Sequence, residues 1–164
     1  MSTDTNFPLS RITTRYDEIE DRVLVSGAAP GDVVYNAWLT RRLMDRLVAS
    51  LAQILAPSNQ DGLAEVLNDF AQHRAEATLE PVPPVIADQD VDSLDALITS
   101  IDIQNHRDFV RLLLRCEGAG AATVSLTHRE LRQWLSIIRQ AYVKSGWPAQ
   151  AWPAWLIAPK ASQG

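Results

Sequence analysis

The sequence of 164 residues contains a single cysteine, which excludes an intramolecular disulfide and any metal site built on several thiolates. Its three histidines, His73, His106 and His128, stand at no spacing typical of metal ligands or of a catalytic pair. No glycine-rich loop precedes a helix, so a phosphate cradle is also missing. We therefore expect no enzyme activity, no metal and no cofactor.

Long apolar runs are absent as well, and none approaches the roughly 18 residues of a membrane span. The polar N-terminus is unlike a signal peptide, so we expect a cytoplasmic protein that does not associate with a membrane. With 46% hydrophobic and 21% charged residues, the composition is typical of a soluble globular chain. This length suits one domain, which we expect to span residues 1–164.

Lysine is scarce, and the net charge of −5 is unevenly spread. Seven acids and no Lys or Arg lie between Glu76 and Asp102, so the remainder of the chain is slightly basic. A net-acidic chain of this kind is a poor match to tight, nonspecific nucleic-acid binding.

An internal repeat organises the chain. The string Leu39-Thr40 recurs as Leu126-Thr127, 87 residues later, and the apolar pattern on both sides is kept at that offset. We interpret this as a duplicated β-β-β-α unit, with repeat unit 1 at about 11–56 and repeat unit 2 at about 97–145.

Within each unit, period-two alternation predicts three short strands, as at Ile12, Thr14 and Tyr16. Short turns between the strands favour an antiparallel meander. The expected fold is α+β, with two three-stranded sheets, each needing a partner, related by a pseudo-twofold axis.

Each unit ends in an amphipathic helix. Thr127 and Glu130 have the spacing of a capping box, and Thr40 is placed to cap the first of the two helices. The apolar periodicity predicts a core made of Val23, Val25, Leu47, Leu51, Val110, Leu112, Trp134 and Ile138.

Three further segments belong to neither unit. An inserted helix is predicted at about 61–77, with one apolar side composed of Leu63, Val66, Leu67 and Phe70. An acidic, proline-containing linker is predicted at about 78–96, and a Trp/Pro arm at 146–164.

Arginines gather at the start of both repeat helices, where the helix dipole makes added cations unfavourable unless an anion compensates. We expect this rim to bind an anion, an acidic partner or the chain's own acidic linker. Its members are Arg41, Arg42 and Arg46 in the first helix and Arg129 and Arg132 in the second.

Three of the five tryptophans lie close together in the arm: Trp147, Trp152 and Trp155. Side chains of this size need cover, so we expect them to contact folded protein. That protein is the same subunit, a second subunit or another partner.

These features favour a non-catalytic binding or adaptor protein that acts through protein–protein contacts, as a homo-oligomer or with another protein. The alternative is a nucleic-acid-binding regulator that uses the arginine rim and the sheet aromatics Tyr16, Tyr35 and Trp38.

Overall fold

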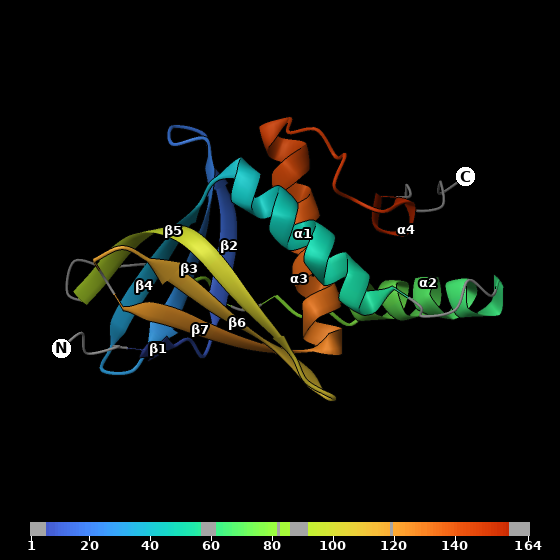
Figure 1. Ribbon diagram of the computed structural model, residues 1–164, viewed down its shortest axis with the longest axis horizontal. Helices are drawn as coiled ribbons and strands as arrows, with labels where there is room; N and C mark the ends of the chain where they lie inside the picture. The colour runs from blue at the N-terminus through green and yellow to red at the C-terminus, as the bar shows by residue number, and fades with distance from the viewer. Residues whose placement is uncertain (1–5, 57–61, 82, 86–91, 119, 158–164) are drawn as a thin grey trace.

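The computed structural model describes residues 6–56, 62–81, 83–85, 92–118 and 120–157, and it has the α+β composition that the sequence predicts (Figure 1). Its strands are β1 (Asn6–Pro8), β2 (Ile12–Asp17), β3 (Arg22–Ala29), β4 (Val33–Leu39), β5 (Asp92–Asn105), β6 (Phe109–Cys116) and β7 (Ala121–Thr127). Its helices are α1 (Arg41–Leu55), α2 (Gly62–Ala77), α3 (His128–Ser145) and α4 (Ala154–Ile157).

The strands form one seven-stranded sheet in the order β1-β7-β6-β5-β4-β3-β2. The two predicted antiparallel meanders are present, but the prediction of two separate sheets is wrong. They are joined because β4 and β5 pair in parallel, from Val33 with Asp92 to Trp38 with Leu97. Strand β5 therefore takes up residues 92–96, which the sequence places in the linker.

Each meander ends in a parallel pairing. Strand β4 pairs in parallel with β5, and β7, at the same place in the second meander, pairs in parallel with β1. The two meanders follow one another along the sheet. The pseudo-twofold axis stays a prediction, because a rotation about the axis of the curled sheet would superpose these two pairings.

The N-terminal strand brings the two sides of the sheet toward each other. Strand β1 pairs in parallel with β7, whereas β2 pairs antiparallel with β3. Between them Ser10 N and Arg11 O both bond to Ala28, which is the pattern of a β-bulge. Leu9 passes so close to Gly27 that a Cβ there would lie 2.5 Å from Leu9 Cδ1. Glycine is needed at this crossing.

Helices α1 and α3 cover the inner surface of the curled sheet (Figure 1). All eight residues predicted for the core are buried. Trp134 Nε1 donates to Thr14 Oγ1 at 2.8 Å and so ties α3 to β2. The hydroxyl of Tyr142, near the end of α3, donates to Asp45 Oδ1, near the start of α1, at 2.5 Å. This bond holds the two helices in an antiparallel arrangement.

The predicted helix caps are confirmed. Thr127 Oγ1 accepts from Glu130 N at 3.2 Å, and Glu130 Oε1 accepts from Thr127 N at 2.9 Å. Thr40 Oγ1 accepts from Leu43 N at 3.3 Å at the start of α1. At the other end of α3, Gly146 is the C-cap with φ 76°, a left-handed conformation that favours glycine.

The capping box predicts a measurable cost for its loss. Thr127→Ala is expected to lower the free energy of unfolding by about 0.5–2 kcal/mol, because the Glu130 amide loses its acceptor. Thr127→Ser keeps the hydroxyl and should change the value less. Urea denaturation of the three proteins measures the difference, and equal midpoints for Ala and Thr would contradict this role.

Candidate binding surface

Helix α2 presents its apolar side to solvent. Phe70 is 70% exposed and Leu63 is 64% exposed, and Val66 and Leu67 are exposed beside them. The spacing i, i+3, i+4, i+7 places these four side chains on one side of the helix. We call Leu63, Val66, Leu67 and Phe70 the α2 stripe. Figure 1 shows the helix projecting past α3, away from the sheet.

The opposite side of α2 is polar and buried. Its buried residues are Asn68, Gln72 and Ala75. Each of them accepts from or donates to α3: Arg132 Nη2 donates to Asn68 Oδ1 at 2.7 Å, and Gln72 Nε2 donates to Arg132 O at 3.0 Å. Gln133 Nε2 donates to the Ala75 carbonyl at 3.0 Å. Directional bonds therefore fix the rotation of α2, with its polar side inward.

Arg132 is the centre of this junction. Besides Asn68, its guanidinium lies 5.8 Å from the centroid of the Trp155 ring, in a cation–π position. Burial lowers the pKa of Arg132, since a half-buried cation is poorly hydrated. The arginine predicted to meet an external anion is thus engaged inside its own chain.

The junction can be tested with two arginines of the same helix. Arg132→Met is expected to lower the free energy of unfolding by about 1.5–3 kcal/mol, the usual cost of a lost hydrogen bond from a charged group. Hydrogen exchange in α2 should also quicken. Arg129→Met is the control, because Arg129 is exposed and surface changes are usually within about 0.5 kcal/mol. Equal effects of the two substitutions would contradict the assignment.

The predicted arginine rim is divided between two places. Since α1 starts beside the end of α3, the two helix N-termini lie far apart. Arg42 and Arg46 are exposed, and Arg41 Nε lies 3.7 Å from Asp45 Oδ2. Arg129 is exposed at the edge of a cavity beside β2. The structure does not bring the five arginines into one surface.

The arm lies against α3 of its own chain. Trp147 and Trp152 are buried, and both rings meet Tyr142 edge to face, at centroid distances of 5.3 and 5.2 Å. Farther along, Arg139 Nη1 donates to Leu156 O at 2.9 Å, and Trp155 is half-buried. The prediction that these tryptophans contact folded protein is confirmed, and the contacts described are with the same subunit.

Two of the sheet aromatics are also engaged. Tyr35 is fully buried, and its hydroxyl donates to Gly120 O at 2.9 Å; burial raises its pKa. The hydrogen bond from Tyr16 to Asp21 Oδ1, at 2.6 Å, raises the pKa of Tyr16 to about 12. Trp38 is half-buried. These side chains offer little flat surface for stacking a base.

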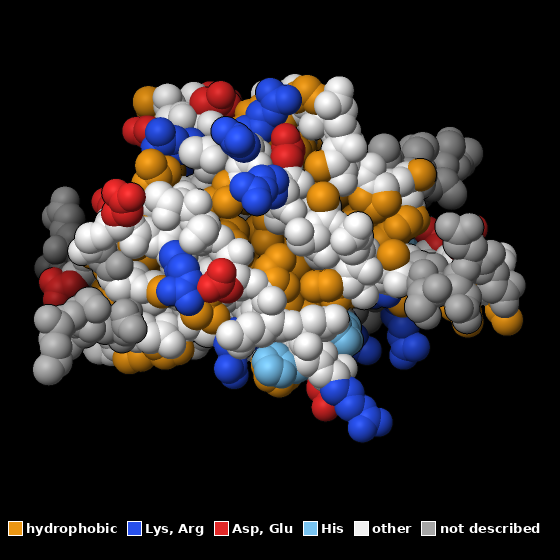
Figure 2. All heavy atoms as spheres, in the orientation of Figure 1, with side chains coloured by type: hydrophobic (Ala, Val, Ile, Leu, Met, Phe, Trp, Pro, Cys, Tyr) orange, Lys and Arg blue, Asp and Glu red, His pale blue; other side chains and the backbone are white. Residues whose placement is uncertain are grey.

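Figure 2 shows apolar side chains gathered in a hollow between α1 and β5, with charged side chains around it.

Within the described residues, no three His, Cys, Asp or Glu side chains are grouped to hold a metal ion. Over the same ranges, no helix is long and apolar enough to cross a membrane.

No protein-family model, no curated protein and no solved structure matches this chain. The α2 stripe, as the most exposed apolar group on a regular element, defines the candidate site.

Proposed function

We propose that this protein is a non-catalytic binding protein that acts through protein–protein contacts and presents α2 to its partner. The observation that carries the proposal is the inverted orientation of α2. Four apolar side chains face water, while polar side chains occupy the interior of the α2–α3 junction. Exposed apolar groups of this size mark interaction sites in many proteins.

The chemistry of the stripe favours a partner with an apolar groove. Anchors at i, i+3, i+4 and i+7 are the pattern by which a helix enters such a groove. Phe70 alone leaves on the order of 100–170 Å² of apolar surface in water. Because the partner would bury this surface, Phe70 is the main anchor. Because α2 is already folded and held by α3, little ordering entropy opposes binding.

A second copy of the chain is the other occupant to consider, because the sequence suggests a homo-oligomer. Two facing stripes give a small contact, whereas stable interfaces bury about 1,200–2,000 Å² in total. A groove that surrounds the helix covers more of α2, and this favours a different protein. Light scattering on the purified chain measures its mass and so distinguishes a homodimer from a monomer that awaits a different protein.

The test begins by identifying what touches α2. A photoreactive phenylalanine is placed at position 66 in the native host, and a matched one at position 143, since Val143 is equally apolar and 76% exposed on α3. Crosslinks to one protein from position 66, absent from position 143, are expected. The same proteins captured from both positions, or none from position 66, would contradict the proposal.

The nucleic-acid alternative has less support. Of its sheet aromatics, Tyr35 is buried and Tyr16 is bonded to Asp21, and Arg132 is half-buried against α2. A cytoplasmic location is part of the same proposal.

We also propose that the segments β2–α1 and β5–α3 arose by duplication. Val23 pairs with Leu39, and Val110, 87 residues after Val23, pairs with Leu126, 87 residues after Leu39. A threonine caps both following helices. The first hairpins differ in register, with Val23 opposite Tyr16 but Val110 opposite Asn105. Superposition of 11–56 on 97–145, strand for strand, would support a common origin.

A further inference from the structure

The N-terminal strand leaves one seam of the curled sheet open. Its first half, β1, pairs with β7 as far as Thr123, where Leu9 N donates to Thr123 O at 2.9 Å. Its second half, β2, pairs with β3. The bulge at Ser10 and Arg11 makes this switch. Beyond the bulge, no ladder joins β2 to β7, and residues of both strands line one cavity.

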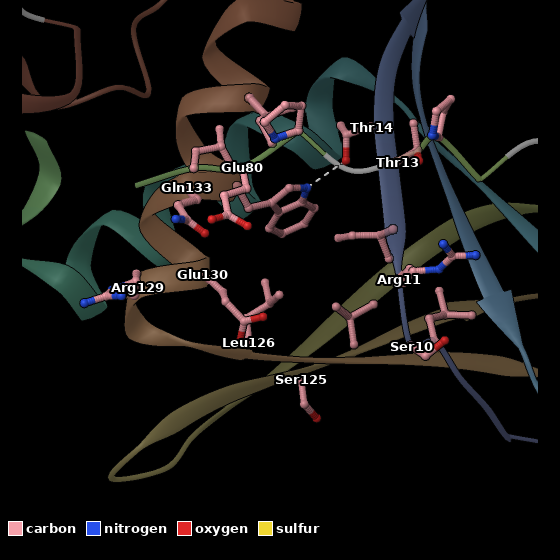
Figure 3. A pocket seen from close by; sticks show the side chains of 18 of the residues that line it. Ser10, Arg11, Thr13, Thr14, Glu80, Ser125, Leu126, Arg129, Glu130 and Gln133 are labelled. Carbon is pink, nitrogen blue, oxygen red and sulfur yellow. Dashed lines mark hydrogen bonds between the residues drawn. The ribbon is translucent and has the colours of Figure 1, made fainter. Parts of the chain in front are cut away.

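A cavity of about 720 Å³ lies in this seam (Figure 3). Strand β2 and helix α3 form two facing walls, β7 forms a third, and the segment 78–81 with Pro84 crosses the fourth side. The volume is within the usual range of ligand sites, about 300–1,000 Å³. Apolar side chains from all three elements line it: Leu9, Ile12, Val124, Leu126, Trp134 and Ile137.

Both strand edges turn backbone groups toward the cavity. On β7 the Thr123 carbonyl accepts from Leu9, just after β1. Backbone groups of every second residue in a strand point to the same side, so the N–H and C=O of Ser125 also point toward the cavity. On β2 the Arg11 carbonyl bonds to β3, so the groups of Ile12 and Thr14 point away from β3. Among the described residues, no backbone hydrogen bond joins these groups to another segment.

We propose that the seam binds an extended peptide segment of another protein, which adds as a strand between β2 and β7. Its backbone bonds to Ile12 and Thr14 on one side and to Ser125 on the other. Every second side chain enters the apolar lining. In this mode main-chain hydrogen bonds supply affinity and the pockets for alternate side chains supply selectivity.

The backbone groups decide between a peptide and a purely apolar small molecule. Covering the N–H and C=O groups of Ser125, Ile12 and Thr14 without hydrogen bonds would be unfavourable, because these polar groups would lose water and gain no partner. An extended peptide satisfies them at the spacing of a sheet. This site lies apart from the α2 stripe, so it stands or falls independently of the function proposed above.

The test uses the full chain and a soluble heptapeptide of alternating valine and threonine, flanked by glutamates. Amide shifts and hydrogen exchange are followed by NMR. We expect saturable shifts at Ile12, Thr14 and Ser125, with slower exchange of their amides. The same peptide with methylated central nitrogens lacks the central backbone donors and should not bind. Equal binding of both peptides, shifts confined to α2, or no shift at millimolar peptide would each overturn the proposal.

Ser125→Pro tests the proposed hydrogen bond between the peptide and the N–H of Ser125 from the protein side. Proline removes only the seam-facing N–H, because the ladder to β6 uses the neighbouring residues. Affinity for the peptide should fall about tenfold, the effect of losing one good hydrogen bond. Ser125→Ala keeps the N–H and should bind as the unmodified chain does; equal affinity of the proline and alanine variants would overturn the assignment of Ser125. If the proline variant fails to fold, the methylated peptide still decides the matter.

Discussion

Deletion of residues 147–164 is expected to lower the free energy of unfolding by about 5–9 kcal/mol, since burying each large apolar side chain contributes roughly 1.5–3 kcal/mol. The deletion removes three buried side chains, Trp147, Trp152 and Leu156. It also removes the bond from Trp147 Nε1 to Asp21 Oδ1 at 3.1 Å. Gly146 is kept, because it caps α3. The loss approaches the whole stability of an ordinary domain, about 5–15 kcal/mol.

Thermal and urea denaturation measure this loss, and light scattering on the same samples measures the mass. Deletion of residues 158–164 alone is the control, since it removes none of the contacts described for the arm. An unchanged melting temperature after the longer deletion would contradict the role of the arm as part of the fold. A fall in mass with the melting temperature unchanged would mean that the arm joins subunits.

Trp134→Ala should be the most damaging single substitution, with a loss of about 3–5 kcal/mol. The Trp134 side chain is buried between α3 and the sheet, and its indole N–H donates to Thr14 Oγ1. Alanine leaves both a cavity and an unsatisfied hydroxyl. The cavity found in the seam would then extend into the core.

Trp134→Phe separates packing from hydrogen bonding. It keeps most of the ring and removes the donor, so its loss should be about 1 kcal/mol. Thr14→Val removes the acceptor, and a double-mutant cycle by urea denaturation gives the coupling of the pair. A loss below about 1 kcal/mol for Trp134→Ala would show that α3 does not depend on this contact.

Local patterns in the sequence predict the helices and the core well. The stripe of α1, the capping box at Thr127 and the position of α2 all follow from periodicity and neighbouring residues. Burial of Val23 and Ile138 follows from the same periodicity, because each lies on the apolar side of an amphipathic element. These features depend on contacts within a few residues.

Pairing between distant strands is not visible in such patterns. Ala37 lies beside Ala96 because β4 and β5 are parallel neighbours, and nothing near either residue indicates this. Closure by β1 depends on three residues, too few to show alternation. The sequence therefore predicts the meanders and misses how they join.

The candidate site was missed for a related reason. Apolar periodicity identifies the α2 stripe but does not show whether it faces the core or solvent. The choice depends on Arg132 and Gln133, which lie about 60 residues beyond the helix residues they bond. The sequence did contain one indication of the orientation of α2, the polar pair Asn68 and Gln72 at i, i+4. Both side chains bond to Arg132 of α3, and this turns the α2 stripe toward solvent.

The affinity of the partner captured through α2 tests the central claim most directly. Phe70→Lys places a charge in the middle of the α2 stripe, and Val143→Lys makes the same change at an exposed apolar residue elsewhere. Both should leave stability nearly unchanged. The account predicts that Phe70→Lys weakens binding by a factor of about ten or more, whereas Val143→Lys binds as the unmodified chain does. Equal affinity of the two variants would contradict it.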